Sequence, residues 1–411
     1  MNYKRLLSPK SVFFFCSFSG IFLFGIIALV KGPIMLEWLA MENDTGWGML
    51  DYFRHVYFTL DREQLYFQSN DACFPPLAYL FYYFIRRVTI QNGTNISSYF
   101  VMPTLPYQMM VFLLYTVIGV VLLVYAIGEL KIKEYEKKLL SISVFFSTPM
   151  FAGAIERGNM LLYVIAILLL AMAWKDSDKP VKRELALILI AIAAGLKIYP
   201  CFTGIIYLKE KRFAEAGRLI IYGLIMFFVP FVFFGGIDGF FGLMDLLMGR
   251  LNIDYTGRVQ FFMGILGNIG IKGKVAYYAN YIFLLCLLIA VLLTKSNIRE
   301  MTFLAAAMAF FPAEAHRYTL LYFLLPLSVL FVEREKDNSI DCYINAVFLG
   351  LLYSIPTVFG IITHFELNYD IYTKTYVEVY IYTIAWCYLL YQFVIEIISK
   401  CNIGVAKTKS C

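Results

Sequence analysis

Charged residues are scarce in this chain, at 16% of its 411 residues, whereas hydrophobic residues make up 61%. A soluble domain carries about 25% charged residues. The shortage excludes a soluble globular protein, so the surface must face lipid. The chain has three histidines and eight cysteines with no CxxC pair, which argues against a zinc site and a disulfide framework. No Walker loop, dinucleotide fingerprint, HExxH or nucleophile elbow is present.

Long hydrophobic runs are present instead. A membrane-spanning helix needs about 20 apolar residues. Five runs reach or approach that length, namely 12–30, 107–128, 277–294, 343–363 and 376–398. The first run, 12–30, is long for a signal peptide, so we predict that it is a helix retained in the protein. The other apolar stretches are shorter and come in pairs. We predict an all-α fold, a polytopic membrane helix bundle with about twelve transmembrane segments, as one domain over residues 1–411.

The basic residues indicate which loops face the cytoplasm. Most of them fall in seven clusters, around Lys4, Lys131, Lys175, Lys209, Lys295, Arg334 and Lys407. The positive-inside rule places all seven clusters, and with them both termini, in the cytoplasm. The chain must then cross the membrane an even number of times between consecutive clusters.

We therefore predict that three apolar stretches between these clusters form hairpins. They are 139–174, 185–208 and 301–332, and their polar tips are residues 156–159, 197–200 and 312–317. Several legs are too short to reach the far interface, so the tips should lie recessed below the outer surface. Charged, irregular backbone at that depth is tolerated only inside protein or beside a water-filled cavity. The sequence thus predicts one outward-opening cavity that the three tips share.

Two long outer segments, residues 31–106 and 235–275, would cover this cavity. Within the first, residues 49–60 have an amphipathic pattern, which is typical of a helix lying in the membrane interface. Its polar stripe includes Asp51 and Arg54. The first outer segment is therefore expected to contain juxtamembrane helices.

A second short helix is expected to open at Pro75-Pro76 and to end at Arg86-Arg87, because proline is favoured in the first turn. If residues 74–90 crossed the membrane, those two arginines would be inside. The run 107–128 would then have to exit, which would strand the lysines around Lys131 outside. We therefore predict that residues 74–90 stay outside or re-enter.

Asp51 is the first candidate for chemistry. A carboxylate on an interfacial helix near the outer mouth can act as a general base and take the proton from an incoming hydroxyl. The alternative is a solvated acidic residue that pairs with Arg54, and His55 is expected to be exposed beside it. Asp44 and Asp71 are rival carboxylates in the same segment.

Lys197 interrupts an otherwise apolar stretch. A lysine at the bilayer centre costs about 2.5–3.5 kcal/mol on insertion scales, which makes it a functional candidate. Its natural ligand is a phosphate on a membrane lipid, and the alternative is that it snorkels to the interface. Arg258, in the second outer segment, is a weaker phosphate candidate.

The first and third tips offer further polar groups. Arg157 can bind phosphate oxygens with its guanidinium fork, or it can form a structural pair with Glu156; Asn159 completes that tip. In the third tip His316 can donate a hydrogen bond to a phosphate or exchange a proton near neutral pH, and Arg317 follows it. A structural role is the alternative for His316.

The order of these elements resembles the C-superfamily of integral-membrane glycosyltransferases, and more narrowly glycosyltransferase family 87, the polyprenyl-phosphate-mannose-dependent mannosyltransferase type. The motifs are Asp51 in the first outer loop, Phe74-Pro75-Pro76-Leu77, Glu156-Arg157-Gly158-Asn159, Gly195-Leu196-Lys197-Ile198-Tyr199-Pro200 and His316-Arg317-Tyr318. They cover most of the chain. Two features depart from the family: its turn often has Gln where Asn159 stands, and the first loop lacks a paired Asp-x-Asp, so no metal ion is expected.

The resemblance implies a mannosyltransferase-like hexosyltransferase that uses a polyprenyl-phosphate sugar and inverts the anomeric carbon. Asp51 would be the base, with His316 as a hydrogen-bond donor, and the substrate-binding set would be Lys197, Arg157, Arg258, Glu156, Asn159 and Arg317. No cofactor is expected. The partners would be the lipid bilayer, the donor lipid and a glycan or glycolipid acceptor, and not nucleic acid. The active site would face the outside of the plasma membrane, in cell-envelope synthesis.

Three other functions stay open. A transporter or lipid flippase places polar breaks near the midplane and often has inverted repeats, whereas the tips here share the outer side. A glycan polymerase or ligase would use a lipid-diphosphate-linked oligosaccharide. A non-catalytic assembly subunit would tolerate changes at Asp51 and Lys197.

Overall fold

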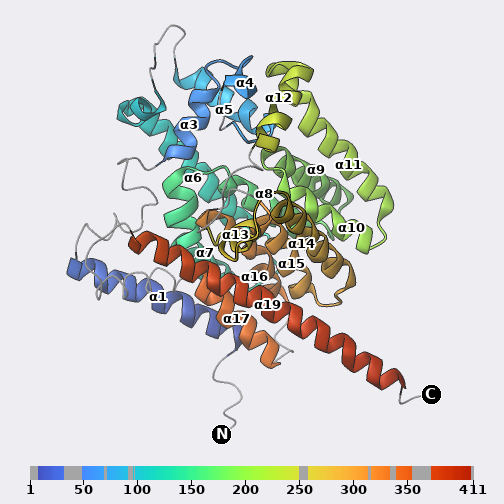
Figure 1. The fold of residues 1–411 in the computed structure, drawn as a ribbon. Helices are drawn as coiled ribbons and strands as arrows, with labels where there is room; N and C mark the ends of the chain where they lie inside the picture. Colours follow the sequence, from blue (N-terminus) through green and yellow to red (C-terminus); the bar gives the residue numbers. More distant parts are fainter. Residues whose placement is uncertain are drawn as a thin grey trace.

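The computed structural model describes residues 8–31, 49–68, 72–90, 96, 98–249, 258–312, 316–333, 339–353 and 372–408, and these residues form helices joined by short links. Within these ranges there is no β-strand. Figure 1 shows α3 (Leu50–Phe58), α4 (Leu65–Gln68), α5 (Pro76–Thr89) and α12 (Gly236–Gly249) at one end of the molecule. The predicted all-α membrane bundle is confirmed.

Among the described residues, four helices are long and apolar enough to cross a membrane, namely Pro106–Gly128, Phe213–Phe233, Gly273–Leu293 and Ile381–Cys401. Shorter apolar helices are Pro9–Leu23, Leu161–Trp174, Arg317–Val332 and Ile340–Tyr353. The five predicted runs fall in α1 (Pro9–Lys31), α6 (Pro106–Gly128), α14 (Gly273–Leu293), α17 (Ile340–Tyr353) and α19 (Tyr372–Thr408). The end of the run 343–363 lies outside the described residues. The count of twelve segments stays a prediction.

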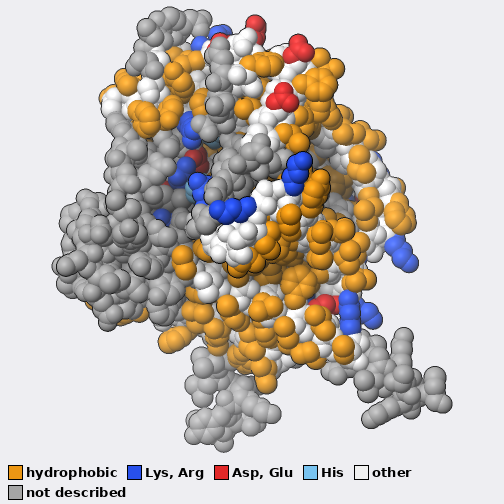
Figure 2. Space-filling view, in the orientation of Figure 1, with side chains coloured by type: hydrophobic (Ala, Val, Ile, Leu, Met, Phe, Trp, Pro, Cys, Tyr) orange, Lys and Arg blue, Asp and Glu red, His pale blue; other side chains and the backbone are white. Residues whose placement is uncertain are grey.

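The centre of the bundle consists of α8 (Leu161–Trp174) and α15 (Asn297–Phe310), in which nearly every residue is buried. Around them α6, α8, α9 (Pro180–Leu196) and α11 (Phe213–Phe228) pack each against the next, and α14 packs on α15. The outward faces of α6, α11 and α14 expose large hydrophobic side chains, and hydrophobic side chains cover much of the face in Figure 2. Helices that are apolar on all sides belong in a core or in lipid.

A layer of short helices covers one end of the bundle (Figure 1). It contains α3 (Leu50–Phe58), α4 (Leu65–Gln68), α5 (Pro76–Thr89), η2 (Tyr99–Thr104) and α12 (Gly236–Gly249), which follows α11 through η5 (Val229–Phe233). Helix α5 begins at Pro76 and has Arg86 and Arg87 in its last turn, as predicted. Its 14 residues are about 21 Å long, so α5 alone cannot cross a hydrocarbon core of about 30 Å.

Each of the three predicted hairpin stretches is interrupted at its tip, with irregular helix beside the interruption. The first runs from α7 (Glu134–Phe145) through the π-helical turn η3 (Met150–Ile155) to α8. The second runs from α9 through the 3₁₀ helix η4 (Tyr199–Gly204) to α10 (Ile205–Lys209). The third runs from α15 through the 3₁₀ helix η7 (Arg317–Phe323) to α16 (Leu324–Val332). Helix α13 (Phe262–Asn268) precedes α14. Such turns occur where a regular helix is interrupted, often at functional sites.

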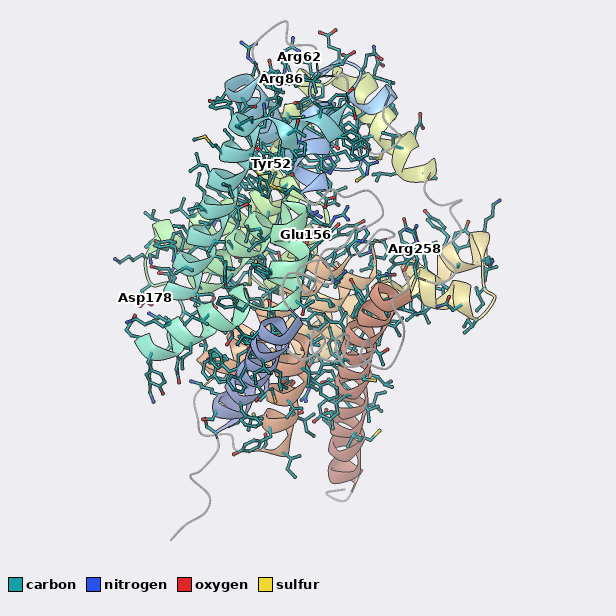
Figure 3. The ribbon with its side chains drawn as sticks, turned by 90° about the vertical axis from the view of Figure 1, so that its left-hand side faces the viewer. Tyr52, Arg62, Arg86, Glu156, Asp178 and Arg258 are labelled. Carbon is teal, nitrogen blue, oxygen red and sulfur yellow. The ribbon has the colours of Figure 1, made fainter. Side chains whose placement is uncertain are left out.

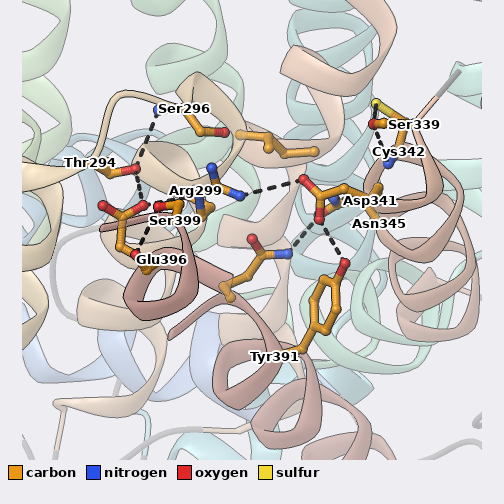
Figure 4. A network of polar contacts seen from close by, with 12 residues as sticks. Thr294, Ser296, Arg299, Ser339, Asp341, Cys342, Asn345, Tyr391, Glu396 and Ser399 are labelled. Carbon is orange, nitrogen blue, oxygen red and sulfur yellow. Dashed lines mark hydrogen bonds and ion pairs between the residues drawn. The ribbon is translucent and has the colours of Figure 1, made fainter. Parts of the chain in front are cut away.

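A polar network joins the C-terminal helix α19 to the bundle (Figure 4). Arg299 Nε lies 3.1 Å from Glu396 Oε2, and its Nη1 lies 3.4 Å from Asp341 Oδ2. Thr294 donates its hydroxyl hydrogen to Glu396 at 2.8 Å, and Lys400 Nζ lies 3.4 Å from the same carboxylate. We call these five residues the Arg299 network. It ties α15, α17 and α19 together through several bonds to each carboxylate.

Candidate active site

The candidate site begins where α3 meets the first hairpin tip. The backbone N–H of Met49 donates a hydrogen bond of 2.6 Å to the carbonyl of Glu156. Asp51 then accepts a bond of 2.6 Å from Arg157 Nη2 and one of 2.5 Å from Asn159 Nδ2. All three side chains are buried. We call Asp51, Arg157 and Asn159 the Asp51 cluster; it fixes α3 to the tip with charge-assisted bonds, which are among the stronger hydrogen bonds in proteins.

Asn159 is oriented by the helix that follows it. Its Oδ1 accepts a hydrogen bond of 2.9 Å from the backbone N–H of Leu161, in the first turn of α8. The amide nitrogen therefore points the other way, toward Asp51. The start of α8 thus sets the direction of one of the two bonds to the carboxylate.

Two glycines bring the tips together. Gly158 has a φ of +63°, and a Cβ there would lie 2.7 Å from the Cβ of Tyr52 and 2.7 Å from a ring carbon of Phe112. A Cβ on Gly153 would lie 2.9 Å from the backbone nitrogen of Tyr318. Side chains do not fit at such distances, and φ > 0 also favours glycine. The first tip is therefore in close contact with α3, with α6 and with the third tip.

Asp51 keeps its negative charge in spite of its burial. Burial raises the pKa of a carboxyl group, but here the charge and the hydrogen bond of the Arg157 guanidinium, together with the bond from Asn159, hold the pKa of Asp51 well below its usual value. Asp51 is therefore a carboxylate at neutral pH. Each carboxylate oxygen has a second lone pair, which leaves room for a further donor.

The prediction that His55 is exposed is wrong. Its side chain is 5% exposed, and its Nδ1 lies 3.1 Å from the hydroxyl of Tyr79. Its ring centroid lies 4.1 Å from that of Phe74 and 5.5 Å from that of Tyr82. His55 packs against α5 rather than facing water, and a pattern in one helix cannot indicate what packs on its polar side.

The alternative interpretation, in which Asp51 is a solvated residue that pairs with Arg54, is wrong. Asp51 pairs with Arg157, whereas the guanidinium of Arg54 lies 5.7 Å from the ring of Phe58 and 5.8 Å from that of Tyr99. Asp51 is thus a buried group joined to a hairpin tip, and not a solvated surface residue.

Lys197 lies at the end of α9, in extended backbone with φ −143° and ψ 131°. Its Nζ is 4.8 Å from the ring centroid of Phe74 and 4.9 Å from that of Tyr318. Among the described residues no carboxylate pairs with it. Aromatic faces attract a cation through the ring quadrupole. The ammonium is therefore held by two rings that do not neutralise it.

A cavity of about 330 Å³ opens beside this lysine, within the range of about 300–1,000 Å³ that small-ligand pockets have. Phe74, Lys197 and Tyr318 form part of its wall, with Asn280 and Tyr281 of α14 among the other lining residues. We call it the Lys197 cavity. In Figure 2 basic, acidic and histidine side chains lie close together on one face of the molecule.

His316, in the third tip, lies within the electrostatic reach of the other groups. Burial and the positive charges of Arg157, Arg258 and Lys197 together lower the pKa of His316 to about 3, and the negative charge of Asp51 opposes this shift. The imidazole is therefore neutral at pH 7 and can donate one hydrogen bond. The structure thus brings together Asp51, Arg157, Lys197, Arg258 and His316, from three tips and both outer segments.

The other predicted site residues lie around this group. Glu156 is half-buried, Arg317 is 2% exposed and Arg258 is exposed. In Figure 3, Arg62 and Arg86 lie at one end of the molecule, and Glu156 and Arg258 lie deeper at a similar level. The recessed position of the first tip below a membrane surface stays a prediction. Asp44 and Asp71, the rival carboxylates, lie outside the described residues.

Neither His55 nor Tyr79 was predicted as a site residue, although His55 contacts Phe74 and Tyr79 contacts His55. One signal was available: His55 follows Asp51 by four residues, so both lie on the same side of a helix. Nothing comparable points to Tyr79, because its contact depends on how α5 packs against α3. Among the described residues, no group of three or more His, Cys, Asp or Glu side chains could hold a metal ion.

A family model for glycosyltransferase family 87 matches residues 74–313, which is more than half of the chain. This chain belongs to glycosyltransferase family 87. It is therefore a membrane glycosyltransferase. The match includes Phe74, the first tip and Lys197 of this family 87 protein, whereas Asp51 and His316 lie outside it. No curated protein matches the chain.

Proposed function

We propose that this family 87 protein transfers a hexose, in the first instance mannose, from a polyprenyl phosphate to an acceptor hydroxyl at the outer face of the plasma membrane. One observation carries the proposal. A buried carboxylate, Asp51, lies within the electrostatic reach of a lysine that no described carboxylate neutralises. A base and a cation for a phosphate are the two groups that such a transfer requires.

In this proposal Asp51 takes the proton of the acceptor hydroxyl as its oxygen attacks the anomeric carbon. The new bond joins the acceptor oxygen to that carbon, and the bond from the carbon to the phosphate oxygen breaks. Its electron pair leaves with the polyprenyl phosphate. A single displacement inverts the anomeric centre, and a positioned base contributes about 10²–10⁴-fold to such a step.

Lys197 binds the phosphate of the donor lipid before the transfer and remains bound to it as the phosphate leaves. His316, neutral at pH 7, donates a hydrogen bond to it, and Arg258 adds a second positive charge. Preorganised charges in a water-poor site are worth more than the same charges in water. Arg157, which the sequence offered as a phosphate ligand, is already bonded to Asp51, so we assign it to orienting the base.

The orientation of the protein is part of the proposal. The basic clusters of the sequence support cytoplasmic termini and an outward-facing site. The layer of α3, α4, α5 and α12 would then cover the site from outside, where an acceptor glycan or glycolipid would enter. No metal ion is assigned to the reaction.

The test uses the purified full-length protein in lipid nanodiscs with a panel of polyprenyl-phosphate hexoses and a disaccharide acceptor series. The expected result is transfer from one of these donors, with the anomeric configuration inverted in the product by NMR. Turnover with a lipid-diphosphate-linked oligosaccharide alone would instead favour a polymerase or ligase. No turnover with any lipid-linked sugar would contradict both.

A further inference from the structure

The ring of Phe74 contacts two groups that the transfer would depend on. The His55 ring lies 4.1 Å away by centroids, with 31° between the planes, and Lys197 Nζ lies 4.8 Å from the same Phe74 centroid. The hydroxyl of Tyr79 holds His55 Nδ1 at 3.1 Å. These residues come from α3, from the start of α5 and from the end of α9. The place of the ammonium therefore depends on elements far from Lys197 in the sequence.

An aromatic clamp suits a cation that must bind an anion. A carboxylate beside Lys197 would neutralise it and compete with a phosphate, whereas the rings of Phe74 and Tyr318 fix it through their quadrupoles and leave its charge available. His55 can stack on Phe74 without repelling the ammonium, because burial lowers the pKa of His55 to about 3 and the ring is neutral at pH 7.

We propose that His55 and Phe74 are positioning residues that hold the Lys197 ammonium at the wall of its cavity, where it receives the phosphate of the donor lipid. This inference rests on the proposed function, from which the phosphate comes. Lys197 touches the phosphate, and the two rings act through it. His55 and Asp51 lie one turn apart on α3, so a single helix orients both the base and the cation.

The first test replaces the ring that carries the contact. Phe74→Leu is expected to raise the KM for the polyprenyl-phosphate sugar by about 2- to 30-fold, the range that a lost cation–π contact gives, with kcat changed by less than about twofold. Phe74→Tyr keeps an aromatic face and is expected to restore the KM. Inhibition by polyprenyl phosphate without a sugar is expected to weaken by the same factor.

Two controls separate positioning from general packing. Phe81→Leu is the same change on α5, the helix that follows Phe74, but Phe81 packs against Tyr115 and Tyr163, so the donor KM is expected to stay unchanged. In a Lys197→Met background, Phe74→Leu is expected to add no further rise in KM, because the ammonium it would position is gone.

Each outcome decides the inference. A folded Phe74→Leu protein with unchanged donor KM and unchanged inhibition overturns it, and so does a full additional effect in the Lys197→Met background. If Phe74→Leu does not fold, His55→Leu is measured instead and is expected to raise the donor KM by a smaller factor. His55→Phe is expected to restore the wild-type KM. An unchanged KM of the His55→Leu protein overturns the inference. A wild-type protein that polyprenyl phosphate neither inhibits nor stabilises against heat overturns the proposed donor itself.

Discussion

The Asp51 cluster and the Arg299 network are both built on an arginine and a carboxylate at a junction of helices, but they differ in how many bonds support each charge. Glu396 has Arg299, Lys400 and the Thr294 hydroxyl around it. Asp51 has hydrogen bonds from Arg157 and Asn159 among the described residues. Redundant bonding is what a structural junction needs. A carboxylate with few bonds, deeply buried, retains capacity for a further donor such as a substrate hydroxyl.

The largest expected difference is in activity. Asp51→Asn is expected to lower kcat by about 10²–10⁴-fold, because the amide cannot take a proton. Asp341→Asn, the same change in the Arg299 network, is expected to leave kcat within a few-fold of the wild type. Transfer of labelled hexose in nanodiscs measures both, with thermal denaturation as the check on folding. Full activity of Asp51→Asn would remove Asp51 as the base.

A second difference is expected in stability. Arg157→Met strands a buried carboxylate and is expected to destabilise the protein by about 3–5 kcal/mol. Arg299→Met is expected to lower the free energy of unfolding by less than half of that amount, because Lys400 and Thr294 still bind Glu396. Denaturant titration of the purified variants in detergent micelles compares them. Equal losses would mean that the two arginines have equivalent roles.

The third comparison concerns the backbone that carries the Asp51 cluster. Gly158→Ala forces a Cβ against Tyr52 and Phe112 at positive φ and is expected to cost about 1–3 kcal/mol. Gly217→Ala, in helix α11 where nothing lies within 4 Å, is expected to stabilise the protein by about 0.5–1 kcal/mol. The melting temperatures should therefore shift in opposite directions. A neutral Gly158→Ala would contradict the close contact of the tip.

The smallest expected effect is on pH dependence. The folded pKa of His55 is lowered by burial from 6.5 to about 3; Arg54, Lys197 and Arg157 also lower it, while Asp51 raises it. Below pH 6.5 the unfolded state binds more protons, so stability falls as the pH decreases. His55→Gln should reduce the loss of melting temperature between pH 7.5 and 5.5. Burial also lowers the pKa of His316, so His316 should still cause part of this loss of melting temperature in the His55→Gln protein. An unchanged slope would contradict a buried, neutral His55.

Much of the fold could be predicted because the bilayer imposes strong rules on sequence. Charge-free runs identified α1, α6 and α14, and the polar interruption at Lys197 identified a hairpin, since α9 ends there. Proline and arginine pairs marked both ends of α5. These signals are local, because each depends on what one segment can do in lipid.

The partners within the site could not be predicted in the same way. Nothing in the sequence specifies that Asp51 pairs with Arg157, because the two are 106 residues apart and several carboxylates and arginines were available. The burial of His55 depends on the packing of α5 against the polar side of α3. A single sequence names the ionic side chains at the tips, whereas which ones meet is decided by tertiary packing.

The separation between Asp51 and Arg157 has a consequence for biosynthesis. A ribosome adding about 5–20 residues per second needs roughly 5–20 s to extend the chain by the 106 positions from Asp51 to Arg157. In the outward-facing orientation proposed above, α3 has left the translocon during that interval without its partner, and its acidic side chain must remain hydrated. Helix α3 can dock only after the Glu156–Asn159 turn is inserted, so an exported loop waits in water for a later hairpin.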